Sequence, residues 1–150
     1  MKSSKQETVM GVLVLLCSAG GIGLFLSSYT TGYYVFGEMN SGLIFLLTAS
    51  GMTVEIAALV IRKKWGSQFW TTYLTFAVTA LLMAGAILLI GDRVEGIGNC
   101  IVTDYDSGHG GEEAIYRSLM ASGILMAGVI FNIIGSFSKR AEKQAHMQVI

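Results

Sequence analysis

A long apolar run between residues 43 and 65 constrains the chain more than any other feature. The run reads LIFLLTASGMTVEIAALVIRKKW; it contains one carboxylate, Glu55, and ends near three consecutive cations, Arg62, Lys63 and Lys64. About 20 mostly apolar residues cross a hydrocarbon core about 30 Å thick, and a basic cluster directly after such a run marks the cytoplasmic end. The run therefore predicts a membrane-spanning helix and its orientation.

The composition extends this prediction to the whole chain. Of the 150 residues, 53% are hydrophobic and only 13% are charged, whereas about a quarter of the residues of a soluble domain are charged. The mean hydropathy is +0.61. We expect a single domain, residues 1–150, of the all-α class: an integral membrane four-helix bundle with spans at about 9–28, 42–61, 69–90 and 118–137.

The positive charges predict how the spans are oriented. Eight of the ten Lys and Arg residues lie in the N-terminal head, the turn between spans two and three, or the C-terminal tail. The positive-inside rule assigns these segments, and so both termini, to the cytoplasm. The segment between spans three and four, residues 91–117, holds six acids and two arginines and is expected to form an acidic extracytoplasmic loop. Trp65, Trp70 and Tyr73 are expected to anchor the cytoplasmic interface.

The first span allows a second interpretation. Two lysines precede an apolar stretch that reaches the small residues Cys17 to Ala19, a pattern also found in secretory signals cleaved after such residues. A lipoprotein signal fits less well, because Leu16 stands before the cysteine where that motif has a small residue. Hydrophobicity continues through Leu26, which favours an uncleaved spanning helix.

The strongest candidate for a functional residue is Glu55. An ionisable group inside a span costs about 2.5 to 3.5 kcal/mol to insert and is a functional hypothesis by default. It lies seven residues before Arg62, and Asn132 and Thr75 are expected at a similar depth on the fourth and third spans. Glu55, Asn132 and Thr75 therefore form a candidate intramembrane polar site for a proton or a cation. The alternative is a neutral or hydrogen-bonded carboxyl that only fixes helix register.

Small residues at fourfold spacing are expected to form the packing faces between helices, because close approach drives helix association in lipid. Ala19 and Gly23, Ala80 and Ala84, and Gly123 and Ala127 show this spacing, as do Ala49, Thr53 and Ala57. The spacing fits the fold of one chain or a homo-oligomer. Proline is absent, which weighs against the broken helices of alternating-access carriers.

The segment from Asp104 to Glu113 is a second candidate site. Its acids, Asp104, Asp106, Glu112 and Glu113, suggest an interaction surface or a weak cation site in the outer loop. The calcium-loop pattern fails, because Gly108 and Ile115 stand at its fifth and twelfth positions. Glu112 and Glu113 are equally well explained by a helix that begins near residue 112, whose dipole favours acids in the first turn.

No residue pattern indicates a catalyst, a cofactor or a metal. His109 has no second histidine or cysteine pair for zinc, and Cys17 and Cys100 are expected on different levels of the membrane, too far apart for a disulfide. Neither a nucleotide-binding glycine loop nor a basic nucleic-acid surface is present. We therefore expect a chain without catalytic residues, metal ligands or cofactors, whose surroundings are the lipid bilayer and a membrane partner or further copies of itself.

The segments RVEGIG and EEAIYRSLMASGILMAGVIFNIIGSF resemble the C-terminal half of small uncharacterised four-span membrane proteins of anaerobic Gram-positive bacteria. This resemblance covers about a third of the chain and implies a bacterial plasma membrane, without an activity. Two functional hypotheses follow from the residues. The first is a non-catalytic accessory or interaction subunit; the second is a small transporter or channel component that uses Glu55.

Overall fold

The computed structural model of the chain describes residues 2–29, 41–65, 69–103 and 111–147, and each of these segments is a helix. The helices are α1 (Lys2–Tyr29), α2 (Ser41–Trp65), α3 (Phe69–Thr103) and α4 (Gly111–Met147). All four contain a stretch long and apolar enough to cross a membrane. The structure thus confirms the expected all-α class and, among the described residues, four helices that could each span a membrane.

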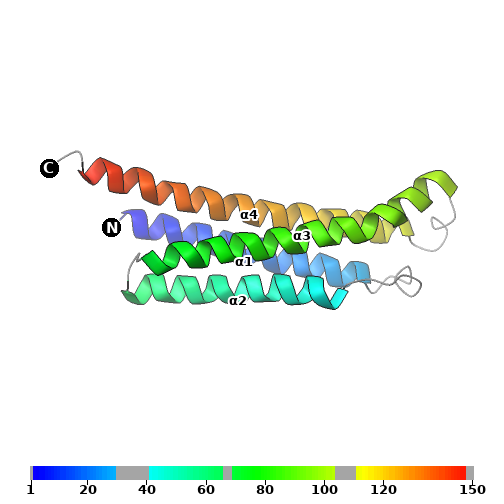
Figure 1. Cartoon of the computed structure of the whole chain (residues 1–150), viewed down its shortest axis with the longest axis horizontal. Helices are drawn as coiled ribbons and strands as arrows, with labels where there is room; N and C mark the ends of the chain where they lie inside the picture. The colour runs from blue at the N-terminus through cyan, green and yellow to red at the C-terminus, as the bar shows by residue number, and fades with distance from the viewer. Residues whose placement is uncertain (1, 30–40, 66–68, 104–110, 148–150) are drawn as a thin grey trace.

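The helices run up and down along one long axis (Figure 1). The start of α1, the end of α2, the start of α3 and the end of α4 lie at the same end of the bundle, which we call the terminal end. The other end is called the far end. Each helix packs against two neighbours, in the order α1, α2, α3, α4 and back to α1, and α1 has its largest contact with α4. Assignment of the terminal end to the cytoplasm stays a prediction from the charges.

The prediction of a long loop over residues 91–117 is wrong. Helix α3 continues to Thr103 and α4 starts at Gly111, so most of the predicted loop is helical. At 1.5 Å per residue, the 35 residues of α3 measure about 52 Å, well beyond a hydrocarbon core of about 30 Å. The charges that ended the predicted span lie at the end of the apolar stretch, at Val94, and not at the end of the helix. Glu112 and Glu113 lie in the first turn of α4, as the helix-dipole argument expected.

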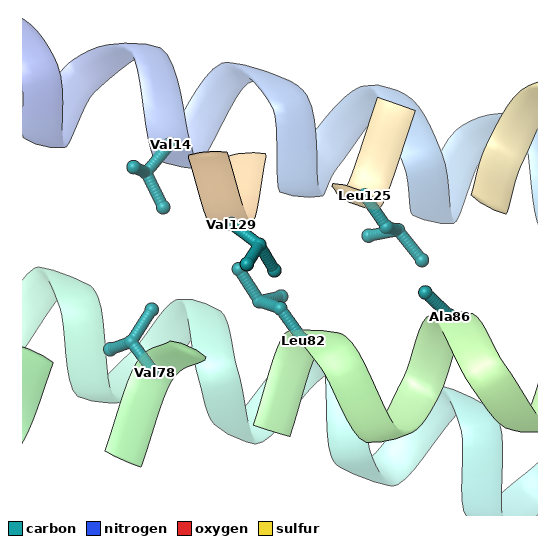
Figure 2. Packing of buried hydrophobic residues seen from close by; sticks show 6 residues of the cluster. All are labelled: Val14, Val78, Leu82, Ala86, Leu125 and Val129. Atoms are coloured by element: carbon teal, nitrogen blue, oxygen red, sulfur yellow. The ribbon is translucent and has the colours of Figure 1, made fainter. Parts of the chain in front are cut away.

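Apolar side chains dominate the middle of the bundle, where the buried hydroxyls of Ser18, Thr48 and Ser122 bond to backbone carbonyls. One cluster of buried side chains joins α1, α3 and α4 and consists of Val14, Val78, Leu82, Ala86, Leu125 and Val129 (Figure 2). A second cluster contains Phe25, Ile44, Leu89 and Ala121, one residue from each helix. These clusters fill the interior between polar groups near the two ends of the bundle.

The glycines that bring helices together are not the ones that the fourfold spacing selected. A Cβ on Gly21 would lie 2.7 Å from Leu125 Cδ2, and one on Gly128 would lie 3.2 Å from a Cβ of α1. Gly23 and Gly123, which were expected to form packing faces, are instead exposed and have no atom within 4 Å of such a Cβ. Fourfold spacing places residues on one side of a helix, but it does not determine which side faces the bundle.

Candidate functional site

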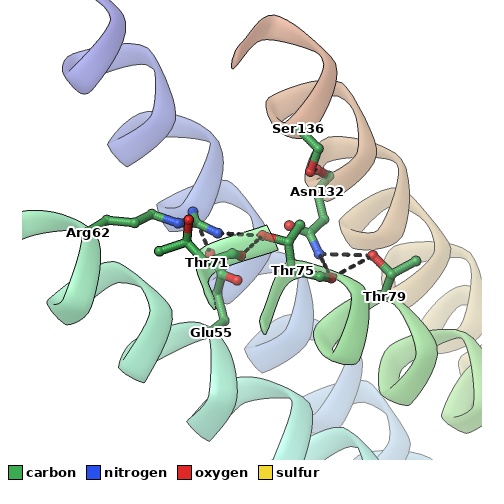
Figure 3. A network of polar contacts seen from close by, with 7 residues as sticks. All are labelled: Glu55, Arg62, Thr71, Thr75, Thr79, Asn132 and Ser136. Carbon is green, nitrogen blue, oxygen red and sulfur yellow. Dashed lines mark hydrogen bonds and ion pairs between the residues drawn. The ribbon is translucent and has the colours of Figure 1, made fainter. Parts of the chain in front are cut away.

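Polar side chains gather inside the bundle near the terminal end (Figure 3). Helix α2 contributes an acid and a cation, α3 contributes three threonines, and α4 contributes an amide and a hydroxyl. We call this group the Glu55 cluster: Glu55, Arg62, Thr71, Thr75, Thr79, Asn132 and Ser136.

Glu55 and Arg62 form an ion pair within α2. Glu55 is completely buried, and its Oε1 lies 3.7 Å from Arg62 Nη1. The two residues are two helical turns apart and so lie on one side of the helix. Side chains in helices lean toward the N-terminus, which directs Arg62 back into the bundle rather than out toward water. Arg62, which the sequence suggested as the end of the span, is therefore the charged partner of Glu55.

Thr75 joins this ion pair to α3. Arg62 Nη2 donates a hydrogen bond to Thr75 Oγ1 over 2.7 Å, and the threonine hydroxyl donates to Thr71 O over 2.8 Å. A hydroxyl that donates to its own helix still offers lone pairs, so it can accept from the guanidinium at the same time. Arg62 therefore bridges the acid of α2 and a hydroxyl of α3.

Asn132 joins the same threonine to α4. Its Nδ2 donates to Thr75 O and to Thr79 Oγ1, each over 3.1 Å, and Ser136 Oγ donates to Asn132 O over 2.9 Å. The structure thus brings Glu55, Thr75 and Asn132 into one network, in which Arg62 is the link between the first two. The described hydrogen bonds of the amide nitrogen go to α3 and not to the carboxyl of Glu55.

A small cleft reaches the cluster from the terminal end. Its walls come from three helices: Glu7, Met10 and Gly11 of α1, Arg62 of α2, and Phe131, Asn132, Gly135 and Ser136 of α4. Its volume of about 10 Å³ is close to the smallest that holds one water molecule. A Cβ placed on Gly11 would lie 2.8 Å from Glu55 Oε1, so the carboxyl packs directly against this glycine of the cleft wall.

A second polar group lies near the far end and was not predicted. Arg93 is only 2% exposed; its Nε donates to Ser118 Oγ over 2.9 Å and its Nη2 to Ser28 Oγ over 3.0 Å. We call Arg93, Ser28 and Ser118 the Arg93 cluster. The assignment of Arg93 to an exposed loop is wrong, because α3 does not end at residue 90. Ser28 and Ser118 carry hydroxyls that can accept hydrogen bonds, and these two serines are the sequence feature that could have indicated a buried donor such as Arg93.

The two clusters lie toward opposite ends of the apolar stretch of α3, which runs from Trp70 to Val94. Thr75 and Arg93 are 18 positions apart on α3, which corresponds to about 27 Å at 1.5 Å per residue. This distance is close to the hydrocarbon thickness of about 30 Å. Trp65, Trp70 and Tyr73 are exposed at the terminal end, and Tyr116 is exposed toward the far end, at levels suited to aromatic belts.

The candidate outer site is only partly described. Asp104 and Asp106 lie outside the described residues, and Glu112 and Glu113 are exposed. Glu113 forms an ion pair with Arg117, whose Nη1 donates to Ser27 Oγ over 2.8 Å. Within the described segments no group of three or more His, Cys, Asp or Glu side chains is arranged to hold a metal ion. Glu113 thus pairs with the arginine that links the start of α4 to α1.

The surroundings of Glu55 disfavour a metal cation as a ligand. A guanidinium 3.7 Å from the carboxyl already compensates its charge and repels a second cation. Comparison of the chain with models of protein families, with curated proteins and with solved structures finds no match. The resemblance to small four-span proteins of Gram-positive bacteria therefore stays a prediction.

Proposed function

We propose that the protein is a non-catalytic integral membrane subunit that acts by association with a membrane protein partner or with further copies of itself. The plasma membrane of a bacterium, with both termini in the cytoplasm, is the location that the charge pattern and the resemblance support. The observation that carries the proposal is the apolar interior. Leu82, in the middle of the apolar stretch of α3, and Leu89, nearer the far end, are completely buried where a route for a substrate through one chain would have to pass.

The exposed surface of the bundle supports the same proposal. Ala19, Gly23 and Gly123 are exposed, and the two glycines leave open space where a side chain would stand. Exposed small residues allow another helix to approach closely in lipid, where van der Waals contact rather than the hydrophobic effect drives association. Helices α3 and α4, with 35 and 37 residues, also extend beyond the membrane and offer surfaces there.

The oligomeric state in lipid tests this proposal. The full chain is placed in lipid nanodiscs or vesicles at low protein density, and copies per particle are counted by single-molecule photobleaching. Gly23→Ile and Gly123→Ile are expected to reduce the oligomer or the partner complex. Gly91→Ile is the matched control, because Gly91 is also an exposed glycine with nothing within 4 Å of its Cβ position, but it lies on α3.

The acidic residues between Asp104 and Glu113 supply a second test. Asp104→Asn, Asp106→Asn and Glu112→Gln remove three charges and leave the Glu113–Arg117 ion pair in place. Capture of a co-purified partner is expected to fall if these acids form the docking surface. A chain that stays monomeric and is isolated without a partner from its native membrane would refute the proposal.

A small transporter or channel component is the second candidate function. It is favoured by the buried ion pair of Glu55 and Arg62 beside a cleft, since intramembrane charges often mark ion or proton pathways. A path across the membrane would then need a second chain, because apolar side chains, and hydroxyls already bonded to backbone carbonyls, fill the described interior. Flux in vesicles that is lost in Glu55→Gln, with the oligomer unchanged, would select this second function.

A further inference from the structure

We propose that Glu55 binds a proton that exchanges with water only from the terminal end, through the cleft between α1, α2 and α4. Protonation of Glu55 breaks its ion pair with Arg62. The inference concerns a ligand and a direction of access. It holds for an accessory subunit and for a transporter component alike, so it does not rest on the proposed function.

Access from the terminal end follows from the position of the cleft. Glu7 and Ser136 border it and lie within one residue of the ends of the apolar stretches of α1 and α4, which are Gln6 and Phe137. That level is near the edge of the hydrocarbon core, where water is available. Gly11 forms part of the wall, and its missing side chain leaves the backbone of α1 next to Glu55 Oε1. The carboxyl thus lies directly behind a wall that water reaches.

Arg62 gives a second indication of water in the cleft. Its Nη2 donates to Thr75 and its Nη1 faces Glu55, whereas its Nε is buried without a hydrogen-bond partner. A buried N–H donor left unsatisfied costs about 1–3 kcal/mol. Arg62 borders a cleft with room for about one water molecule, and a water there would accept this hydrogen bond.

Access from the far end is blocked by side chains. Val78, Leu82 and Ala86 follow Thr75 along the inner side of α3, and each is completely buried. They pack against Val14 of α1 and Leu125 of α4, so apolar contacts separate the Glu55 cluster from the Arg93 cluster. Proton exchange through this layer would require a charge to cross the apolar centre of the bundle.

The proton-binding step is balanced by groups already present. A proton from water adds to a carboxylate oxygen of Glu55 and gives a neutral carboxylic acid, while Arg62 keeps its proton and its hydrogen bond to Thr75. The ion pair becomes a single positive charge beside the cleft, whose lining also includes the acid Glu7. Among the described residues that border this region, α3 and α4 supply uncharged groups: Thr71, Thr75, Asn132 and Ser136.

Chemical labelling from each side of the membrane tests the inference. The full chain is reconstituted in vesicles, and those with an N-terminal affinity tag outside are isolated, so that the terminal end faces the outer buffer. Dicyclohexylcarbodiimide, which enters through lipid and modifies protonated carboxyls, is added at different outer and inner pH values. The label on the peptide that contains Glu55 is measured by mass spectrometry.

We expect labelling to rise as the outer pH falls, by about tenfold per pH unit while Glu55 is mostly ionised, and to be independent of the inner pH. Arg62→Gln should increase labelling at neutral pH, because the positive charge that favours the carboxylate is gone. Lys63→Gln is the matched control. Lys63 carries the same charge and is the next residue after Arg62, but its side chain is exposed, so its removal should leave the pH profile unchanged.

Three results would overturn the inference: no label on Glu55 at any pH, labelling insensitive to the outer pH, or labelling that follows the inner pH. Glu55→Gln must lose the label on this peptide, and since the wild-type peptide is mapped directly, the result stands even if that variant folds poorly. Loss of association with normal labelling would refute the proposed function alone. Normal association without labelling would refute this inference alone.

Discussion

Removal of Arg62 is expected to destabilise the bundle strongly, because it leaves the acid behind. Glu55 is fully buried, and the side chain of Arg62 is 11% exposed, so solvent screens the pair little. Breaking a buried ion pair by removing one partner costs about 3–5 kcal/mol. The separation of 3.7 Å is longer than a hydrogen bond, which places Arg62→Gln near the lower limit of that range. At about 3 kcal/mol the unfolding equilibrium shifts by more than a hundredfold.

Reversible unfolding of purified protein in mixed detergent micelles, followed by circular dichroism, measures this effect. Glu55→Gln and the double variant complete a mutant cycle. We expect the double variant to be more stable than Arg62→Gln, because no buried carboxylate is left uncompensated. Lys63→Gln, at an exposed side chain, should stay within about 0.5 kcal/mol of the wild type. Equal effects at residues 62 and 63, or additive single effects, would refute an energetically coupled ion pair.

Three further substitutions test other parts of the fold in the same unfolding assay. Arg93→Leu removes the two hydrogen bonds that the guanidinium donates to Ser28 and Ser118, whose hydroxyls keep each other and Ala114 O as partners. The loss should cost about 1–3 kcal/mol, and a neutral result would show that the cluster is not formed. Gly128→Leu should prevent α1 from approaching α4, whereas Gly123→Leu, which points to open space, should leave stability unchanged. Leu82→Ala opens a cavity in the completely buried core and should cost about 2–5 kcal/mol, against a much smaller loss for the exposed Met83→Ala.

The four helices were predictable because twenty-residue apolar runs leave few alternatives in a membrane. The helix ends were not, because a helix does not stop where the membrane does. Gly91, Asp92 and Arg93 read as the start of a loop, yet α3 continues for ten more residues after them. Charged residues are compatible with a helix in water, so polarity locates the interface and leaves the backbone conformation undetermined.

The members of the candidate site were easier to predict than its connections. Counting residues from the basic ends placed Glu55, Thr75 and Asn132 at one depth, and the structure joins them in one network. Depth gives no information on the direction of a side chain. Arg62 was therefore assigned to the interface as a stop signal, and the charged partner of the acid was missed.

The direction in which each helix crosses the membrane explains which arginines are buried. Side chains lean toward the N-terminus of their helix, so a cation at the C-terminal end of a span leans into the membrane and one at the N-terminal end leans out. Arg62 and Arg93 close the apolar stretches of α2 and α3 and both lie inside the bundle. Arg117 stands in the second turn of α4 and reaches back to Glu113, one turn closer to the N-terminus. Counting charges predicts the orientation of a span. Whether a cation at the end of a span is buried in the bundle depends on the side of the helix that carries it and on the lean of its side chain toward the N-terminus.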